Sequence, residues 1–171
     1  MKQIVIIFLI VLLSAQNINS QINNELTDLA SFLKQKEYVA IPINKILSGH
    51  LCLIAEINGI FATLILDTGA GVTILESKRA EKFQLDFSIS ENSATGAGGS
   101  NLTLSTSTIK ELKIADFFVE NYEVYLMNLD HVNNAFLQMG LEEVDGVIGA
   151  DILTNNNAII DYGNLILYLK K

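Results

Sequence analysis

Short apolar runs broken by turn residues follow one another along most of this chain, and the clearest pair predicts a β-hairpin. The runs LCLIAEI (51–57) and IFATLILD (60–67) are separated only by Asn58-Gly59. Both turn residues tolerate a positive φ, and Asn-Gly between apolar runs is the strongest short-range signal for a hairpin. The second arm of this hairpin therefore ends on Asp67.

Further β-prone runs continue toward the C-terminus. They are VTIL (72–75), LTLSTSTI (102–109), LKIADFFV (112–119), YEVYLMNL (122–129), and the two halves of IIDYGNLILYL (159–169) around Tyr162-Gly163-Asn164. VDGVIGADIL (144–153) reads as a strand, a glycine break and the start of a helix. Many short strands with frequent turns and few helices predict an all-β barrel or sandwich. The absence of an internal repeat predicts a single lobe.

Helical spacing is confined to short stretches. Residues 22–37 place apolar side chains at helical intervals and predict an amphipathic helix, which leads into the extended segment YVAIPI (38–43). ESKRAEKFQL (76–85) predicts a helix of two turns, and HVNNAFLQM (131–139) predicts another short helix.

The first twenty residues have a different composition from the rest. Lys2 is followed by an apolar run over 4–13 and then by small and polar residues. This pattern is typical of a secretory signal peptide, and the run is well short of the ~20 residues that span a bilayer. Cleavage is expected after Ala15 or Ser20, with an uncleaved anchor as the alternative. We therefore expect an exported protein, periplasmic or extracellular, without stable membrane insertion after cleavage.

Charge narrows the partners of the remaining chain. Removal of residues 1–20 takes away one basic residue, Lys2, and no acidic one. The chain that is left has ten basic and nineteen acidic residues, a net charge of −9. Such a charge disfavours nucleic acid and anionic membranes as partners. Cys52, the only cysteine, is expected to be a buried small apolar residue. His50 and His131 stand apart without a metal-ligand spacing, so no metal site is expected.

Asp67 is the candidate for chemistry. It follows the apolar residues Leu64-Ile65-Leu66 and precedes Thr68-Gly69-Ala70-Gly71. Burying a carboxylate at a strand end is costly unless it is hydrogen-bonded or useful. A structural turn is the simpler interpretation of any Asp-Thr-Gly taken alone.

Four features, in this order, resemble the retropepsin-like aspartic peptidases, including bacterial exported members. They are the hairpin with LILDTGAG (64–71), the glycine-rich ATGAGG (94–99), DGVIGADIL (145–153) and the closing IIDYGNLILYL (159–169). The resemblance covers about residues 48–171, preceded by a signal peptide (1–20) and an N-terminal helix and extended segment (21–47). It implies a single-lobe closed β-barrel with one or two short helices.

The resemblance also implies roles for individual residues. Asp67 resembles the catalytic aspartate, Thr68 the residue that locks two active-site loops across a two-fold axis, and Gly69 the donor of an amide to the carboxylate. Gly96, Ala97, Gly98 and Gly99 resemble the tip of a flap over the substrate, and Val147, Ile148 and Gly149 the segment that packs beneath the catalytic loop or lines the pocket.

This chemistry requires two carboxylates that share a proton, one activating a water and one polarising the scissile carbonyl. The chain has one Asp-Thr-Gly, so the resemblance implies a homodimer that hydrolyses polypeptides with Asp67 from each copy and no cofactor. Asp161-Tyr162-Gly163 is a weaker candidate because tyrosine does not suit that loop. Asp145 and Asp151 are expected to be turn and helix-cap residues.

Two further points concern the end of the loop. Ala70 follows the Asp-Thr-Gly in place of a serine. A serine hydroxyl there could hydrogen-bond the ionised carboxylate and lower its pKa, whereas alanine cannot, so we expect an activity optimum at about pH 5–6. Gly71 and Val72 replace acidic residues that bind the substrate backbone in retroviral members.

Two alternatives to a general peptidase remain. One is an inactive binding or scaffolding module of the cell envelope, and the other is a protease with one envelope target. The role of the segment 21–47 is left open: it could be a cover over the site, a dimer strand or a spacer.

Overall fold

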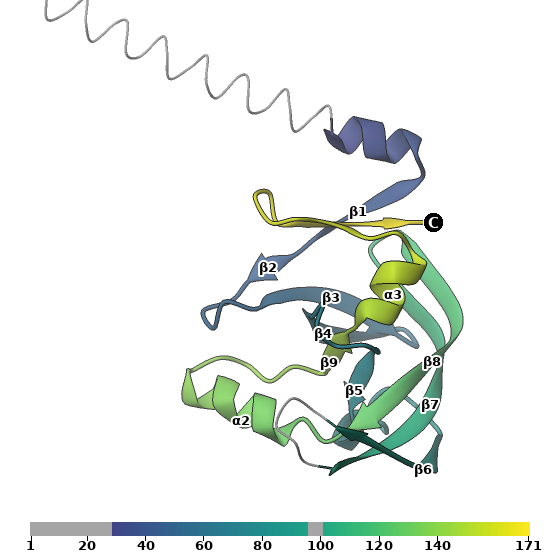
Figure 1. Ribbon diagram of the computed structural model, residues 1–171, viewed down its shortest axis with the longest axis vertical. Helices are drawn as coiled ribbons and strands as arrows, with labels where there is room; N and C mark the ends of the chain where they lie inside the picture. The colour runs from purple at the N-terminus through teal and green to yellow at the C-terminus, as the bar shows by residue number, and fades with distance from the viewer. Residues whose placement is uncertain (1–28, 96–100) are drawn as a thin grey trace, which may run out of the picture. The chain divides into compact units, whose positions relative to one another are not determined.

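The computed structural model describes residues 29–95 and 101–171 (Figure 1). The expected signal peptide (1–20) and the expected flap tip (96–99) lie outside the described residues. The chain divides into two compact units, 1–38 and 39–171, which are described separately. None of the described helices has the length and apolarity needed to cross a membrane.

The described part of the first unit contains a short helix over residues 29–35, within the segment predicted to be helical. Lys36 N–H donates to Leu33 O at 2.9 Å, and Glu37 adopts a φ of 67°. The left-handed conformation at Glu37 ends the helix, because an α-helix cannot continue through a positive φ.

From Tyr38 onward the structure consists mainly of strands. In chain order the elements are β1 (Tyr38–Pro42), β2 (Asn44–Lys45), β3 (Leu51–Ile57), β4 (Ile60–Leu66), β5 (Ile74–Glu76), the 3₁₀-helix η1 (Ser77–Arg79), β6 (Phe87–Thr95), β7 (Asn101–Ile114), β8 (Phe117–Met127), α2 (Asp130–Gln138), β9 (Gly146–Ile148), α3 (Ala150–Asn155), β10 (Ile159–Asp161) and β11 (Ile166–Lys170).

Six of these strands close into a barrel. Their order is β3-β4-β9-β5-β8-β7, and the additional pairing of β3 with β7 completes the ring. β2 extends the sheet beside β3, and β6 extends it beside β7. A separate three-stranded sheet has the order β1-β11-β10. The predicted all-β closed barrel is confirmed.

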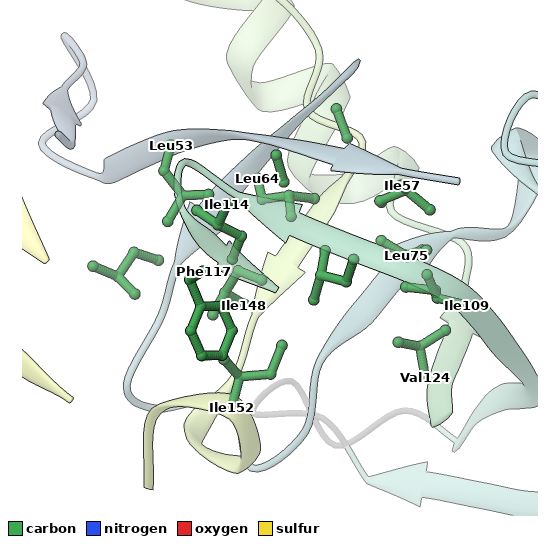
Figure 2. Packing of buried hydrophobic residues seen from close by; sticks show 14 of the residues in the cluster. Leu53, Ile57, Leu64, Leu75, Ile109, Ile114, Phe117, Val124, Ile148 and Ile152 are labelled. Carbon is green, nitrogen blue, oxygen red and sulfur yellow. The ribbon is translucent and has the colours of Figure 1, made fainter. Parts of the chain in front are cut away.

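The barrel interior is filled by aliphatic side chains from alternate strand positions. Figure 2 shows them packed between the strands and against α3. Leu53, Ile57, Leu64, Leu75 and Ile109 are each at most 1% exposed. Full burial of such a side chain stabilises a protein by roughly 1.5–3 kcal/mol, so this core holds the strands that carry the site.

The predicted Asn-Gly hairpin is confirmed, and its asparagine side chain has a further structural role. Asn58 and Gly59 have φ angles of 51° and 79°. The Asn58 side-chain amide donates to Phe83 O at 2.7 Å, and its oxygen accepts from Glu111 N–H at 3.1 Å. The tip of the β3–β4 hairpin is therefore fixed both to the turn that contains Phe83 and to β7.

Two local predictions differ from the structure. Residues 76–85 do not form a helix of two turns: Glu76 ends β5, where it is buried and its carboxylate accepts from Leu129 N–H at 2.7 Å, and the rest forms η1 and turns up to Gln84, which has a φ of 55°. The segment 112–119 is not one strand: β7 and β8 meet there in a tight turn, with Ile114 opposite Phe117 and Ala115 at a φ of 52°.

Candidate active site

Asp67 follows the last residue of β4, at the place where this strand lies parallel to β9. Leu66 is in register with Ile148, and Asp67 N–H donates to Ile148 O at 3.1 Å. The parallel pairing brings the Asp-Thr-Gly loop against the segment that follows β9. The Asp67 side chain is exposed.

The carboxylate of Asp67 is held by its own loop. Gly69 N–H donates to Asp67 Oδ1 at 2.8 Å, and Ala70 N–H donates to Asp67 O at 3.3 Å. A Cβ on residue 69 would lie 3.2 Å from Asp67 Oδ1, so glycine permits this close approach. Thr68 and Gly69 are both exposed. The result is an exposed carboxylate with one oxygen oriented by a backbone amide, which suits a general acid or base.

Ala70 joins the loop to the interior. Its carbonyl accepts from Ala150 N–H at 2.7 Å, and its side chain packs against a small apolar cluster that includes Cys52, Val147 and Phe136 of α2. Cys52 is 5% exposed, as predicted, and burial raises the pKa of its thiol above the usual value.

The predicted segment Val147-Ile148-Gly149 lies directly beside the loop. Val147 and Ile148 are buried in β9. Gly149 precedes α3, and a Cβ there would meet the carbonyl carbon and oxygen of Val72 at 2.4 Å. Only glycine allows the two chains to pass this closely. The structure thus brings together Asp67, Thr68, Gly69 and Ala70 with this segment.

A contact between Thr73 and Asp151 was not predicted from the sequence. Thr73 N–H donates to Asp151 Oδ2 and Thr73 Oγ1 donates to Asp151 Oδ1, both at 2.8 Å. Asp151 was predicted to cap a helix, but the N-cap of α3 is Gly149, and Asp151 lies in the first turn, where it accepts from Ile152 N–H at 2.8 Å. The available signal was the threonine inside the apolar run VTIL, because a buried hydroxyl requires a partner.

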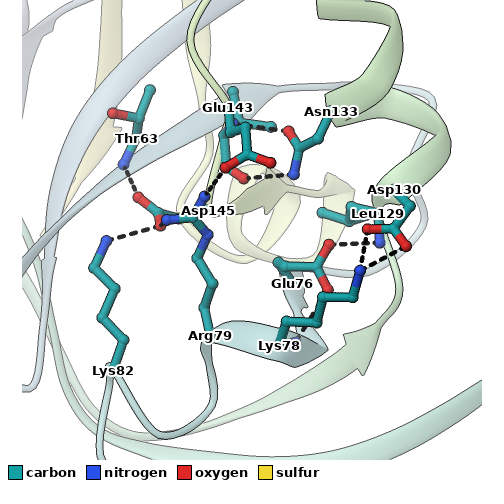
Figure 3. A network of polar contacts seen from close by, with 11 residues as sticks. Thr63, Glu76, Lys78, Arg79, Lys82, Leu129, Asp130, Asn133, Glu143 and Asp145 are labelled. Carbon is teal, nitrogen blue, oxygen red and sulfur yellow. Dashed lines mark hydrogen bonds and ion pairs between the residues drawn. The ribbon is translucent and has the colours of Figure 1, made fainter. Parts of the chain in front are cut away.

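The two other aspartates considered from the sequence have structural partners. Asp145 is 5% exposed and lies 3.0 Å from Arg79 and 2.8 Å from Lys82 (Figure 3). Asp161 accepts from the side-chain amide of Asn164 at 2.7 Å and from its backbone N–H at 2.9 Å. These bonds, the side-chain bond first, lower the pKa of Asp161.

Residues 29–95 and 101–171 contain no group of three or more His, Cys, Asp or Glu side chains placed to hold a metal ion. His50 contacts a serine and an aromatic ring. His50 Nδ1 lies 2.8 Å from Ser48 Oγ, and its ring lies 5.4 Å from that of Phe136.

Comparisons with known proteins agree with this architecture. A family model described as aspartyl protease matches residues 53–152, more than half of the chain. The structure is similar to that of a retropepsin-like aspartic protease from Rickettsia conorii, with a TM-score of 0.51, 20% identity, and coverage of 77% of this chain and 90% of that chain. It is also similar to EIAV protease complexed with the inhibitor HBY-793, with a TM-score of 0.50, 17% identity, and coverage of 69% and 98%. The curated proteins contain no significant match. The two structures confirm the predicted fold.

Proposed function

This chain belongs to the aspartyl protease family and has the retropepsin-like fold, and from that premise we propose that it is an aspartic endopeptidase with Asp67 as its catalytic residue. One observation carries the proposal: the Asp67 carboxylate is exposed at the end of a barrel strand, and Gly69 N–H holds one of its oxygens at 2.8 Å. Asp145 and Asp161 are engaged in structural contacts instead.

The reaction requires a second carboxylate, which a second copy of the chain supplies. One Asp67 is ionised and takes a proton from a water, whose oxygen attacks the scissile carbonyl carbon. The other Asp67 is protonated and donates its proton to the carbonyl oxygen. Collapse of the tetrahedral intermediate breaks the C–N bond as the first Asp67 gives the proton it took from the water to the leaving nitrogen, and a hydroxyl of the intermediate returns a proton to the second Asp67. Two adjacent carboxylates share one proton because both cannot ionise cheaply.

The exposure of Thr68 and Gly69 supports this arrangement, since the loop around Asp67 is accessible to a second copy. The substrate is a polypeptide, and no cofactor takes part. The proposed place of action is outside the cytoplasm, on the basis of the apolar run over 4–13 and the small residues after it.

The test is cleavage of a mixed peptide library between about pH 3 and 7, with the mass of the protein determined by light scattering. We expect cleavage by the wild-type chain, with activity that follows the dimer fraction. Asp67→Asn should remove cleavage while the protein stays folded, because an amide cannot activate the water. Asp161→Asn is the matched control and should keep the activity.

Mixing wild-type chain with excess Asp67→Asn tests the shared site directly. Exchange into mixed dimers should lower the activity, because each mixed dimer has only one carboxylate at the axis. Activity retained by Asp67→Asn would contradict the mechanism. A folded dimer that cleaves no peptide would contradict general peptidase activity and favour a binding module or a protease with one target.

A further inference from the structure

The loop that carries Asp67 is attached along its length to four consecutive residues, 148–151. At its start, Asp67 N–H bonds to Ile148 O at 3.1 Å, and in its middle Ala150 N–H bonds to Ala70 O at 2.7 Å. These contacts are between backbone groups, which any sequence can make. The end of the loop also has a backbone bond, from Tyr125 N–H to Thr73 O at 3.1 Å, but it is held in addition by the contact of Thr73 with the Asp151 carboxylate.

Thr73 uses both of its donor groups in this contact, while its carbonyl accepts from Tyr125 N–H at 3.1 Å. It is 1% exposed, and its N–H and its hydroxyl both donate to the Asp151 carboxylate at 2.8 Å. The same hydroxyl oxygen accepts from Gly149 N–H at 3.1 Å. The hydroxyl therefore links Gly149 and Asp151 to the last residue of the loop, with its proton directed at the carboxylate.

Asp151 accepts and does not donate in this network. Three donors reach its two oxygens: the Thr73 amide, the Thr73 hydroxyl and Ile152 N–H. An ionised carboxylate suits three donors, whereas a side-chain amide would point its own N–H groups at some of them. The phenol of Tyr122 lies beside Asp151, and burial followed by this negative charge raises the pKa of Tyr122.

We propose that Asp151 is a positioning residue for Asp67: its carboxylate, acting through Thr73, fixes the end of the loop that holds the catalytic aspartate. The proposal rests on the proposed function for its catalytic consequence, and on the contacts alone for the placement of the loop. A displacement of about 1 Å in a reacting group can lower a rate by about 100-fold. A loop held at one end only by backbone bonds would allow such a displacement.

Four variants test this. Asp151→Asn replaces one carboxylate oxygen with an NH₂ group, which then faces N–H and O–H donors. Thr73→Val removes the hydroxyl and leaves Gly149 N–H without that acceptor. Thr73→Ser keeps the hydroxyl and serves as the rescue. Asp145→Asn is the matched control: Asp145 is also a largely buried carboxylate bonded to a backbone amide, that of Thr63 at 2.9 Å, before β9.

Four quantities are measured for each variant: kcat and KM on one cleaved peptide, the midpoint of unfolding, and amide hydrogen exchange over residues 67–73. Asp151→Asn and Thr73→Val should lower kcat by about 100-fold at a nearly constant KM, because the binding surface stays while the reacting group is displaced. Both should also speed exchange over 67–73. Thr73→Ser should restore kcat to within about fivefold of the wild-type value.

Asp145→Asn separates positioning from stability. It should lower the midpoint of unfolding but keep kcat and the exchange of 67–73 below that midpoint. Equal losses of kcat in Asp145→Asn and Asp151→Asn, or an unchanged kcat in Asp151→Asn, would overturn the proposal. If the wild-type chain cleaves nothing, the proposed function fails, and amide hydrogen exchange over residues 67–73 then tests the positioning by itself. Faster exchange in Asp151→Asn but not in Asp145→Asn supports the positioning of the loop, and unchanged exchange in Asp151→Asn overturns it.

Discussion

Asp145 and Thr63 exchange two hydrogen bonds beside the parallel pair of β4 and β9. Asp145 N–H donates to Thr63 O at 2.8 Å, and Thr63 N–H donates to Asp145 Oδ2 at 2.9 Å. The other carboxylate oxygen of Asp145 faces Lys82 and Arg79, as Figure 3 shows. This side chain thus ties the chain entering β9 both to β4 and to two cations, Arg79 at the end of η1 and Lys82 in the turn after it.

Replacement of Asp145 by alanine should destabilise the protein. The change leaves the Thr63 amide without its acceptor and removes the carboxylate that Arg79 and Lys82 share. Loss of one partner from a buried pair costs about 3–5 kcal/mol. Because the two cations are 28% and 37% exposed, we expect a smaller loss, about 2–3 kcal/mol in the free energy of unfolding.

Urea denaturation measures this loss, and the exposed pair of Lys78 and Asp130 provides the control. Their side chains are 61% and 46% exposed, so solvent screens the interaction and Lys78→Ala should leave the unfolding midpoint unchanged. A similar destabilisation by both substitutions would contradict the assignment of Asp145 as the structural carboxylate.

Gly149→Ala should disturb the contact between the active-site loop and the segment before α3. Its Cβ would lie 2.4 Å from the carbonyl atoms of Val72, where backbone cannot move aside cheaply. Overpacking of this kind costs about 1–3 kcal/mol. Gly71→Ala is the control, because a Cβ at Gly71 meets nothing within 4 Å. Thermal unfolding of both variants checks this, and equal midpoints would contradict the close passage of the two chains.

The sequence predicted the features that follow from local pattern. The apolar runs of the hairpin, the Asn58-Gly59 turn and the glycine break at Gly149 each depend on neighbouring residues, and each is found in the structure. These are also the features that carry the resemblance to the family, so the barrel and the surroundings of Asp67 could be predicted together.

The contacts that complete the site depend on residues far apart in the chain, and local pattern does not specify them. Thr73 and Asp151 are separated by 78 positions, and neither shows its partner in its own segment. The turn at Ala115 was missed for a similar reason. An alanine at a φ of 52° carries no turn signal, and the long β7–β8 pairing imposes that conformation.

The thiol of Cys52 should be unreactive in the folded protein. It is 5% exposed, and burial raises its pKa, so both access and the thiolate fraction are reduced. Labelling with a thiol reagent should be slow in native buffer and rapid in denaturant, where the same single thiol is the internal control. Rapid labelling of the native protein would show that the small apolar cluster around Phe136 opens readily.

Tyr122 should make the stability of the protein fall at alkaline pH. Burial, and then the charge of Asp151, raise the pKa of its phenol in the folded state. Below about pH 10, the usual value for tyrosine, the phenol is protonated in both states and the fold is unaffected. Above that pH the unfolded chain releases this proton and the folded chain keeps it, so the free energy of unfolding decreases as pH rises.

Unfolding midpoints between about pH 8 and 11, together with the ultraviolet titration of the five tyrosines, measure this effect. Tyr122→Phe should flatten the alkaline decline. Asp151→Asn should bring the titration of Tyr122 to lower pH without returning it to the usual value, because burial, the larger cause, remains. A titration of Tyr122 that does not respond to Asp151→Asn would mean that no negative charge sits beside the phenol. It would thereby also remove the charged carboxylate on which the contact with Thr73 depends.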